Sequence, residues 1–132
     1  MKKFNTPKAA LEYVKILCNR NLRYEICGFL GYCTEDNTFI VQETENASDN
    51  PQAFFLVDPL EYLLFKEDYS ILALYHSHIV GDEEPSDFDI EMSENSCLPF
   101  LIFSLNTQKI HIYEPQNSDS DVNTLGRIKV LL

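Results

Sequence analysis

The feature that most restricts the fold is a continuous apolar run at residues 70–75, which leads directly into His76, Ser77 and His78. An apolar run without polar alternation is typical of a β-strand that is covered on both faces. Such a strand needs other strands beside it and helices packed over it. The run therefore predicts an α/β fold.

The remaining segments predict the elements around this strand. Helices are expected over residues 7–21, 58–68 and 87–95, where capping residues and prolines precede apolar positions. The second of these helices is expected to bury Leu60, Leu63 and Leu64, with Tyr62 and Phe65 as further candidates for the buried face. Further strands are expected at residues 25–33, 38–42, 54–57, 99–105, 109–113 and 127–132, and loops at 43–52 and 114–124. Together they predict a mixed, mostly antiparallel sheet flanked by helices.

Length, charge and cysteine usage limit the functional classes. The 132 residues are expected to form one domain, 1–132. A net charge of −11 disfavours nucleic acid and anionic membranes as partners and favours a neutral or basic one. No signal peptide and no apolar run of about 20 residues are present, so a cytoplasmic protein is expected. Cys18, Cys27, Cys33 and Cys97 form no CxxC pair and are expected to be reduced thiols.

The end of the central strand has the composition of a metal site. His76 and His78 are one residue apart, so their side chains project to the same side of an extended chain. Asp89, at a helix start after Pro85 and Ser86, is placed to add a carboxylate. Two imidazoles and one carboxylate leave a coordination position free for water, which is typical of catalytic zinc. Ser86-x-x-Asp89 has an alternative, purely structural interpretation, because it is also the pattern of an ordinary capping box at a helix start.

The complete pattern is Glu25, His76-x-His78, seven residues, then Ser86-x-x-Asp89. It resembles the JAMM motif of the MPN+ (JAB/MPN) zinc metalloprotease family. The resemblance implies an MPN/JAB domain with a cytidine-deaminase-like architecture. It also implies that His76, His78 and Asp89 bind Zn²⁺, that Glu25 is the general base, and that Ser86 donates a hydrogen bond to the developing oxyanion.

The same resemblance implies an activity and a substrate class. The chain is similar to minimal prokaryotic or phage members, which implies a hydrolase that cleaves a peptide or isopeptide bond. The expected substrate is the flexible C-terminal tail of a ubiquitin-like or sulfur-carrier protein, entering as an extended peptide along a sheet edge. The alternative is a non-catalytic or partner-activated MPN-type interaction module. Such modules usually lose ligands, whereas this chain retains all five motif residues.

The sequence departs from the family pattern at one position and lacks the residues that three other kinds of zinc site require. Many family members have proline where this chain has Ile79, followed here by acidic residues 82–84, which affects the shape of the loop and the substrate preference. A metallo-β-lactamase motif needs Asp and His where Val80 and Gly81 stand. A nucleobase deaminase needs H-x-E and P-C-x-x-C, and an amidohydrolase barrel needs roughly 250 residues. His111 is expected on an exposed strand face.

Overall fold

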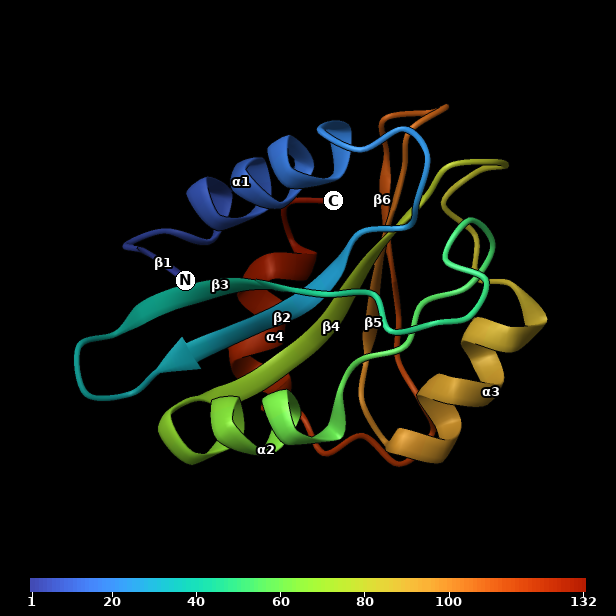
Figure 1. The fold of residues 1–132 in the computed structure, drawn as a ribbon. Coiled ribbons are helices and arrows are strands. Elements are labelled where there is room, and N and C mark those ends of the chain that lie inside the picture. The colour runs from blue at the N-terminus through green and yellow to red at the C-terminus, as the bar shows by residue number, and fades with distance from the viewer.

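The computed structural model describes all 132 residues and contains one six-stranded sheet with four helices (Figure 1). The strand order is β1-β3-β2-β4-β5-β6. Only β4 and β5 are parallel, and every other neighbouring pair is antiparallel. The fold is therefore α/β with a mixed, mostly antiparallel sheet, as predicted. The strands are β1 Lys2–Phe4, β2 Cys27–Cys33, β3 Thr38–Thr44, β4 Ser70–His78, β5 Phe100–Ser104 and β6 Ile110–Tyr113; the helices are α1 Pro7–Asn19, α2 Pro59–Asp68, α3 Asp87–Ser96 and α4 Val122–Lys129.

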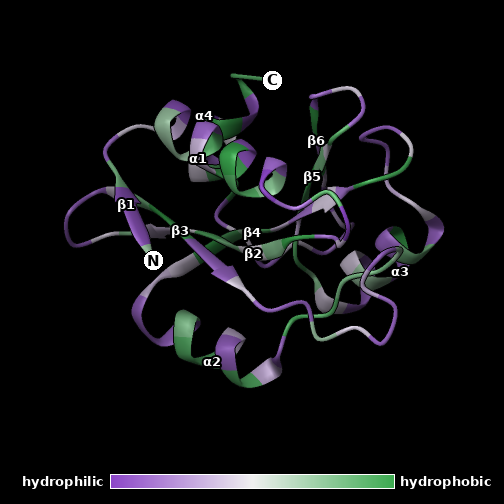
Figure 2. Cartoon of the chain, turned by 45° about the horizontal axis from the view of Figure 1, so that its top comes forward, coloured by the Kyte–Doolittle hydropathy of each residue, from purple (hydrophilic) through white to green (hydrophobic).

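Strand β4 lies inside the sheet, between β2 and β5, and every residue after Ser70 is buried. Helices α1 and α4 lie together on one side of the sheet and α2 lies on the other (Figure 2). Two apolar cores correspond to these two sides. One contains the buried residues of α1 and α4, and the other contains Phe65 of α2 together with Phe55 and Phe100. The continuous apolar run is thus covered on both faces, as the sequence predicts.

A β-bulge interrupts the pairing of β4 with β2. Leu30 pairs with Ala73, but the next residue, Gly31, pairs with Ile71, so Leu72 has no partner of its own. Leu72 and Ala73 consequently both face the core under α1 and α4. Ile71, before the bulge, faces the opposite core. The bulge takes up one extra residue, so the residues after it keep the faces that their pairing with β2 requires.

The three helices predicted from caps are confirmed, but of the residues predicted for the buried face of α2 only Phe65 is buried. Leu60, Leu63 and Leu64 are 61%, 57% and 54% exposed, so their predicted burial is wrong. The helix instead buries Phe65, whose ring stacks on Phe29 with centroids 5.0 Å apart. A Cβ atom at Gly31 would lie 2.5 Å from the Phe65 ring, so the glycine is what lets this ring approach the sheet. The leucines therefore point away from the sheet.

Two predicted strands are absent, and one strand was not predicted. Residues 54–57 lie outside the sheet, in which β4 has β2 and β5 as its two neighbours. Residues 127–129 are instead the last turn of α4, which Asp121 caps and which packs through Leu125 and Ile128 beside α1. The short β1 pairs with β3 at the sheet edge.

All four cysteines are free thiols, and three of them are buried. None of the four helices has the length and apolarity that crossing a bilayer requires.

Candidate metal centre

The last residues of β4 present two imidazoles on the face that carries α3. His76 and His78 project to the same side because strand side chains alternate, and their Nε2 atoms lie 3.3 Å apart. His76 is fully buried and His78 is 9% exposed. The strand extends through both histidines, so pairing with β2 and β5 fixes the backbone that carries them.

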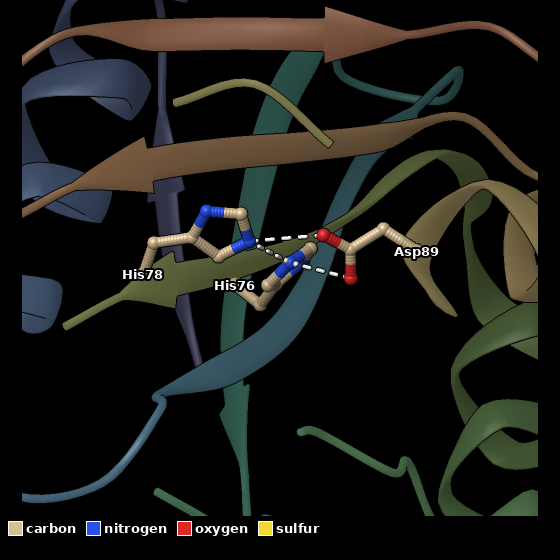
Figure 3. Close-up of side chains that lie close together, drawn as sticks. All are labelled: His76, His78 and Asp89. Atoms are coloured by element: carbon tan, nitrogen blue, oxygen red, sulfur yellow. Dashed lines mark hydrogen bonds and ion pairs between the residues drawn. The ribbon is translucent and has the colours of Figure 1, made fainter. Parts of the chain in front are cut away.

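The third member of the group, Asp89, is aimed by the capping box of α3. The Ser86 Oγ accepts a hydrogen bond from the Asp89 backbone N–H at 3.1 Å, and the Ser86 N–H donates to Asp89 Oδ2 at 3.0 Å. The carboxylate then spans both histidines: Oδ1 lies 3.1 Å from His76 Nε2, and Oδ2 lies 2.9 Å from His78 Nε2 (Figure 3). The capping interpretation of Ser86-x-x-Asp89 is therefore correct, and the cap also orients the carboxylate.

These separations fit a metal ion. An ion bonded tetrahedrally at about 2.0–2.1 Å has ligand atoms roughly 3.3 Å apart, and the two imidazole Nε2 atoms lie 3.3 Å apart, with one Asp89 oxygen 3.1 Å from His76 and the other 2.9 Å from His78. His76, His78 and Asp89 form a group whose ligand atoms all lie within 4.8 Å of one another. Two imidazoles and one carboxylate can therefore hold three corners of a tetrahedron and leave the fourth open.

The two histidines are oriented by different means. The Nδ1 of His78 lies 2.8 Å from the Asp82 carbonyl oxygen, to which it can donate, leaving Nε2 free to bind a metal. The Nδ1 of His76 is buried without a partner. Packing holds that ring instead: Phe55 stacks on it with centroids 4.1 Å apart, and the edge of Phe100 lies at 5.7 Å.

The surroundings shift the pKa values of the three residues in different directions. Burial lowers the pKa of His76 below its usual range, which favours the neutral ligand form. Burial acts in the same direction on His78, but the hydrogen bonds to Asp89 and Asp82 outweigh it and raise the pKa of His78. For Asp89, burial alone would raise the pKa, and the hydrogen bonds from both histidines and Ser86 lower it overall. Asp89 is therefore an anion between two imidazoles.

The loop after β4 is held against the turn between β5 and β6. The Gly81 carbonyl accepts hydrogen bonds from Ser104 Oγ at 2.8 Å and Asn106 Nδ2 at 3.0 Å. Thr107 Oγ1 donates to Glu83 at 2.6 Å, and this bond lowers the pKa of the Glu83 carboxyl. The acidic loop is thus fixed in place, and the Asp82 carbonyl stays beside His78.

Glu25 lies just before β2 and outside the group of three ligands. It is 6% exposed and takes part in none of the four ion pairs. Burial raises the pKa of its carboxyl to about 8, while the charge of His78 lowers it and that of Asp89 raises it. Glu25 is one of the residues that line a cavity of about 300 Å³, together with Glu43, Glu45 and Asn46. Glu25 is therefore a buried, ionisable group within electrostatic reach of the imidazoles.

The structure brings the predicted site residues into one region. His76, His78 and Asp89 are in mutual contact, Ser86 is hydrogen-bonded to Asp89, and Glu25 interacts with the group through its charge. His111 lies on β6, paired with Ile102 of β5, and is not part of the group.

Three further residues shape the site and carried no sequence signal. Phe55 was assigned to a strand, yet it stacks on His76. Ser77 faces away from the histidines, and its Oγ accepts a hydrogen bond from the Ile26 N–H at 2.9 Å. Asn46, in a polar loop, is hydrogen-bonded to the Glu25 carbonyl at 3.0 Å. All three act through contacts between segments far apart in the chain, which local patterns do not reveal.

Comparisons with known proteins agree with this geometry. The chain is similar to protein DSY2949 from Desulfitobacterium hafniense, whose structure was determined in solution. The two have a TM-score of 0.63 and 28% sequence identity, and the match covers 80% of this chain and 77% of that one. No curated protein matches the chain. A sequence model described as prokaryotic homologs of the JAB domain matches residues 11–116, a range that contains Glu25, His76, His78, Ser86 and Asp89. The chain therefore belongs to the family of prokaryotic homologs of the JAB domain.

Proposed function

We propose that this protein is a zinc-dependent peptidase that hydrolyses a peptide or isopeptide bond. The observation that carries the proposal is one arrangement: two imidazoles and a carboxylate whose ligand atoms lie within 4.8 Å of one another, near a buried carboxyl whose pKa is raised to about 8. Binding alone needs the ligands but not a base. The joint presence of both favours hydrolysis over a purely structural metal site.

His76, His78 and Asp89 would hold the metal. Two imidazole nitrogens and one carboxylate oxygen suit zinc, and the family resemblance supports that choice. When bound, zinc lowers the pKa of a coordinated water and polarises a carbonyl group.

Glu25 is proposed as the general base. A catalytic base works best when its pKa lies near the working pH, and burial moves the pKa of this carboxyl to about 8. Glu25 would take a proton from the attacking water and then give it to the leaving amine. A bound metal ion nearby would lower the pKa of Glu25 through its positive charge, and the carboxyl would then be ionised and able to accept a proton.

Ser86 is proposed as the oxyanion donor. Its Oγ accepts the capping hydrogen bond from the Asp89 N–H, so the cap uses the oxygen and leaves the hydroxyl proton available. Ser86 is also exposed and can be reached by a substrate. The capping role and the donor role are therefore compatible, because they use different atoms of one hydroxyl.

The proposed substrate is the flexible C-terminal tail of a ubiquitin-like or sulfur-carrier protein, as the family resemblance implies. The net charge of −11 favours a neutral or basic partner rather than nucleic acid, and the free thiols suit a cytoplasmic location. The expected route along a sheet edge is not available beside the histidines. β4 has β2 and β5 on its two sides, and the free edges belong to β1 and β6. A tail would therefore approach over the face of the sheet that carries α3.

The test combines metal analysis with hydrolysis of a fusion protein that has a Gly-Gly tail. We expect one zinc per chain in the wild type and in Glu25→Gln, with hydrolysis only by the wild type. Wild-type protein purified without chelator and lacking metal would refute the site. Equal hydrolysis by Glu25→Gln would refute the base role. Zinc binding without hydrolysis of any tailed substrate would favour the interaction-module alternative.

A further inference from the structure

Asn46, in the loop after β3, uses the whole hydrogen-bonding capacity of its side-chain amide. Its Nδ2 donates to the Glu25 carbonyl at 3.0 Å and to the Phe54 carbonyl at 2.9 Å. Its Oδ1 accepts from the Ser48 N–H at 3.0 Å and the Leu56 N–H at 3.1 Å. Two carbonyls on one side and two N–H groups on the other fix the orientation of the amide. A half-buried side chain with four partners is held rigidly.

These bonds join two segments that reach the site from different directions. One segment contains Glu25, which precedes β2 and lies outside the sheet ladder. The other contains Phe55, whose ring stacks on His76 and also lines an apolar cavity of about 300 Å³ between α2 and α3. Apart from Asn46, two backbone bonds connect this second segment to the loop: the Ala47 N–H donates to the Leu56 carbonyl at 2.9 Å, and the Phe54 N–H donates to the Asn50 carbonyl at 3.0 Å.

The backbone of Glu25 depends on this loop. Its N–H donates to the Pro51 carbonyl at 2.7 Å, and its carbonyl accepts from Asn46. Both anchors therefore come from the loop between β3 and α2, and neither is a sheet or helix bond. The direction of the Glu25 carboxyl is consequently set by the loop, with Asn46 as its most connected side chain.

We propose that Asn46 is a positioning residue. Its two amide N–H bonds hold the backbone of Glu25 in a fixed position relative to the segment that contains Phe55, the ring that stacks on His76. Asn46 touches none of the three metal ligands. It acts through Glu25, so the catalytic part of the proposal rests on the proposed function, in which Glu25 is the base. Misplacing a catalytic group by about 1 Å can cost 10²-fold in rate.

The test variant is Asn46→Asp, which keeps the volume and the acceptor oxygen but loses both N–H donors. The matched control is Asn50→Asp, which adds the same charge to the same loop, at an exposed residue whose side chain makes no hydrogen bond. For Asn46→Asp we expect kcat to fall about 10–100-fold with KM changed less than about twofold. Zinc content should stay at the wild-type value, and Asn50→Asp should behave as the wild type.

A second measurement does not depend on activity. Amide hydrogen exchange at Glu25, whose N–H is bonded to Pro51, should be faster in Asn46→Asp than in Asn50→Asp, while exchange along β4 stays unchanged. Ser120→Ala serves as a control for general destabilisation, because it removes a hydroxyl bond to the Leu72 carbonyl far from Glu25. It should lower the melting temperature without a selective loss of kcat.

Three outcomes would overturn the proposal: unchanged kcat and exchange in Asn46→Asp, loss of zinc from that variant, or an equal loss of kcat in Ser120→Ala at the same drop in melting temperature. Failure of the proposed function gives a different result. If the wild type is inactive, or if Glu25→Gln is as active as the wild type, the base role fails. The exchange comparison still decides whether Asn46 holds the Glu25 backbone.

Discussion

Glu25 and Asp89 are two carboxyl groups beside the same pair of histidines, and their surroundings give them opposite acidities. Asp89 accepts hydrogen bonds from two imidazoles and one backbone N–H, and these lower its pKa. Glu25 lacks such partners, and burial raises the pKa of its carboxyl to about 8. Neighbouring groups whose pKa values are driven apart are typical of acid–base chemistry. The two carboxyls are thus suited to a ligand role and a proton-transfer role, respectively.

The raised pKa of Glu25 predicts a pH-dependent stability in metal-free protein. The folded pKa of about 8 lies above the unfolded value of about 4.3, so between these values the folded state holds a proton that the unfolded state lacks. Stability from this group is therefore lost as pH rises through that window. Glu25→Gln cannot ionise, so its melting temperature relative to the wild type should increase from pH 5 to pH 8. Chelator-treated samples and thermal denaturation provide the measurement, with the exposed Glu45→Gln as the control. A difference independent of pH would contradict the prediction.

Asp89→Asn tests the charge of the third ligand. The amide oxygen can still accept the Ser86 N–H bond, but the anion between the two imidazoles is lost. Changes to groups around metal ligands typically cost roughly 10–100-fold in affinity, and loss of a charged ligand should cost at least that. Competition with a chromogenic chelator measures the zinc affinity. Wild-type affinity in this variant, with the fold intact by circular dichroism, would exclude Asp89 as a ligand.

At the scale of elements, the N-terminus of α3 combines a cap with the proposed oxyanion donor. Ser86→Ala should lose about 1 kcal/mol of stability with the cap, whereas Ser86→Gly should lose only a few tenths. Both variants lack the hydroxyl proton, so both should lose about 10²–10³-fold in kcat. Denaturant unfolding and steady-state kinetics together separate the two roles. A kcat that follows the stability difference between Ala and Gly would assign Ser86 to capping alone.

The elements that the sequence predicted are those with a local cause. Caps and prolines marked the starts of α1, α2 and α3, and the apolar runs marked β2, β4 and β5. The errors occurred where packing between distant segments decides. Residues 54–57 have the composition of a strand but join no strand of the sheet, and this segment is held by the hydrogen bond from the Leu56 N–H to Asn46 and by the stacking of Phe55 on His76. Residues 127–132 alternate enough to resemble a strand, yet Leu125 and Ile128 are spaced for a helix that packs beside α1.

The sequence indicated the group of candidate ligands, whose proximity the structure shows, but not the residues that support them. His76, His78, Ser86 and Asp89 follow from spacing, because a strand and a helix start fix where such side chains point. Nothing local indicates that Asn46 reaches Glu25, since this bond joins residues 21 positions apart through a loop. The exposure of the α2 leucines is of the same kind, because it depends on which aromatic ring fits against Gly31.

At the scale of the whole molecule, metal binding should be linked to folding. The three ligand atoms come from β4 and α3 and meet only in the folded chain. Free zinc at 100 times its dissociation constant should therefore stabilise the protein by about 2.7 kcal/mol, which is roughly 10 °C in melting temperature for a chain of this size. Thermal denaturation with chelator and with added zinc measures the shift. Glu25→Gln should show the full shift and Asp89→Asn a smaller one, and a wild type that does not respond would contradict the assignment.

The bulge at Leu72 gives the central strand an uneven tolerance to changes in length. β4 carries one residue more than its ladder with β2 requires, and the surplus lies at Leu72 and Ala73. A chain lacking either of these residues would alternate without interruption from Ile71 onward and keep both imidazoles towards Asp89. A chain lacking Ser77 would make the histidines sequence neighbours, and their side chains would then diverge to opposite faces. Homologous strands that are shorter by one residue at the bulge can therefore retain the site, whereas a one-residue deletion a few positions later abolishes it.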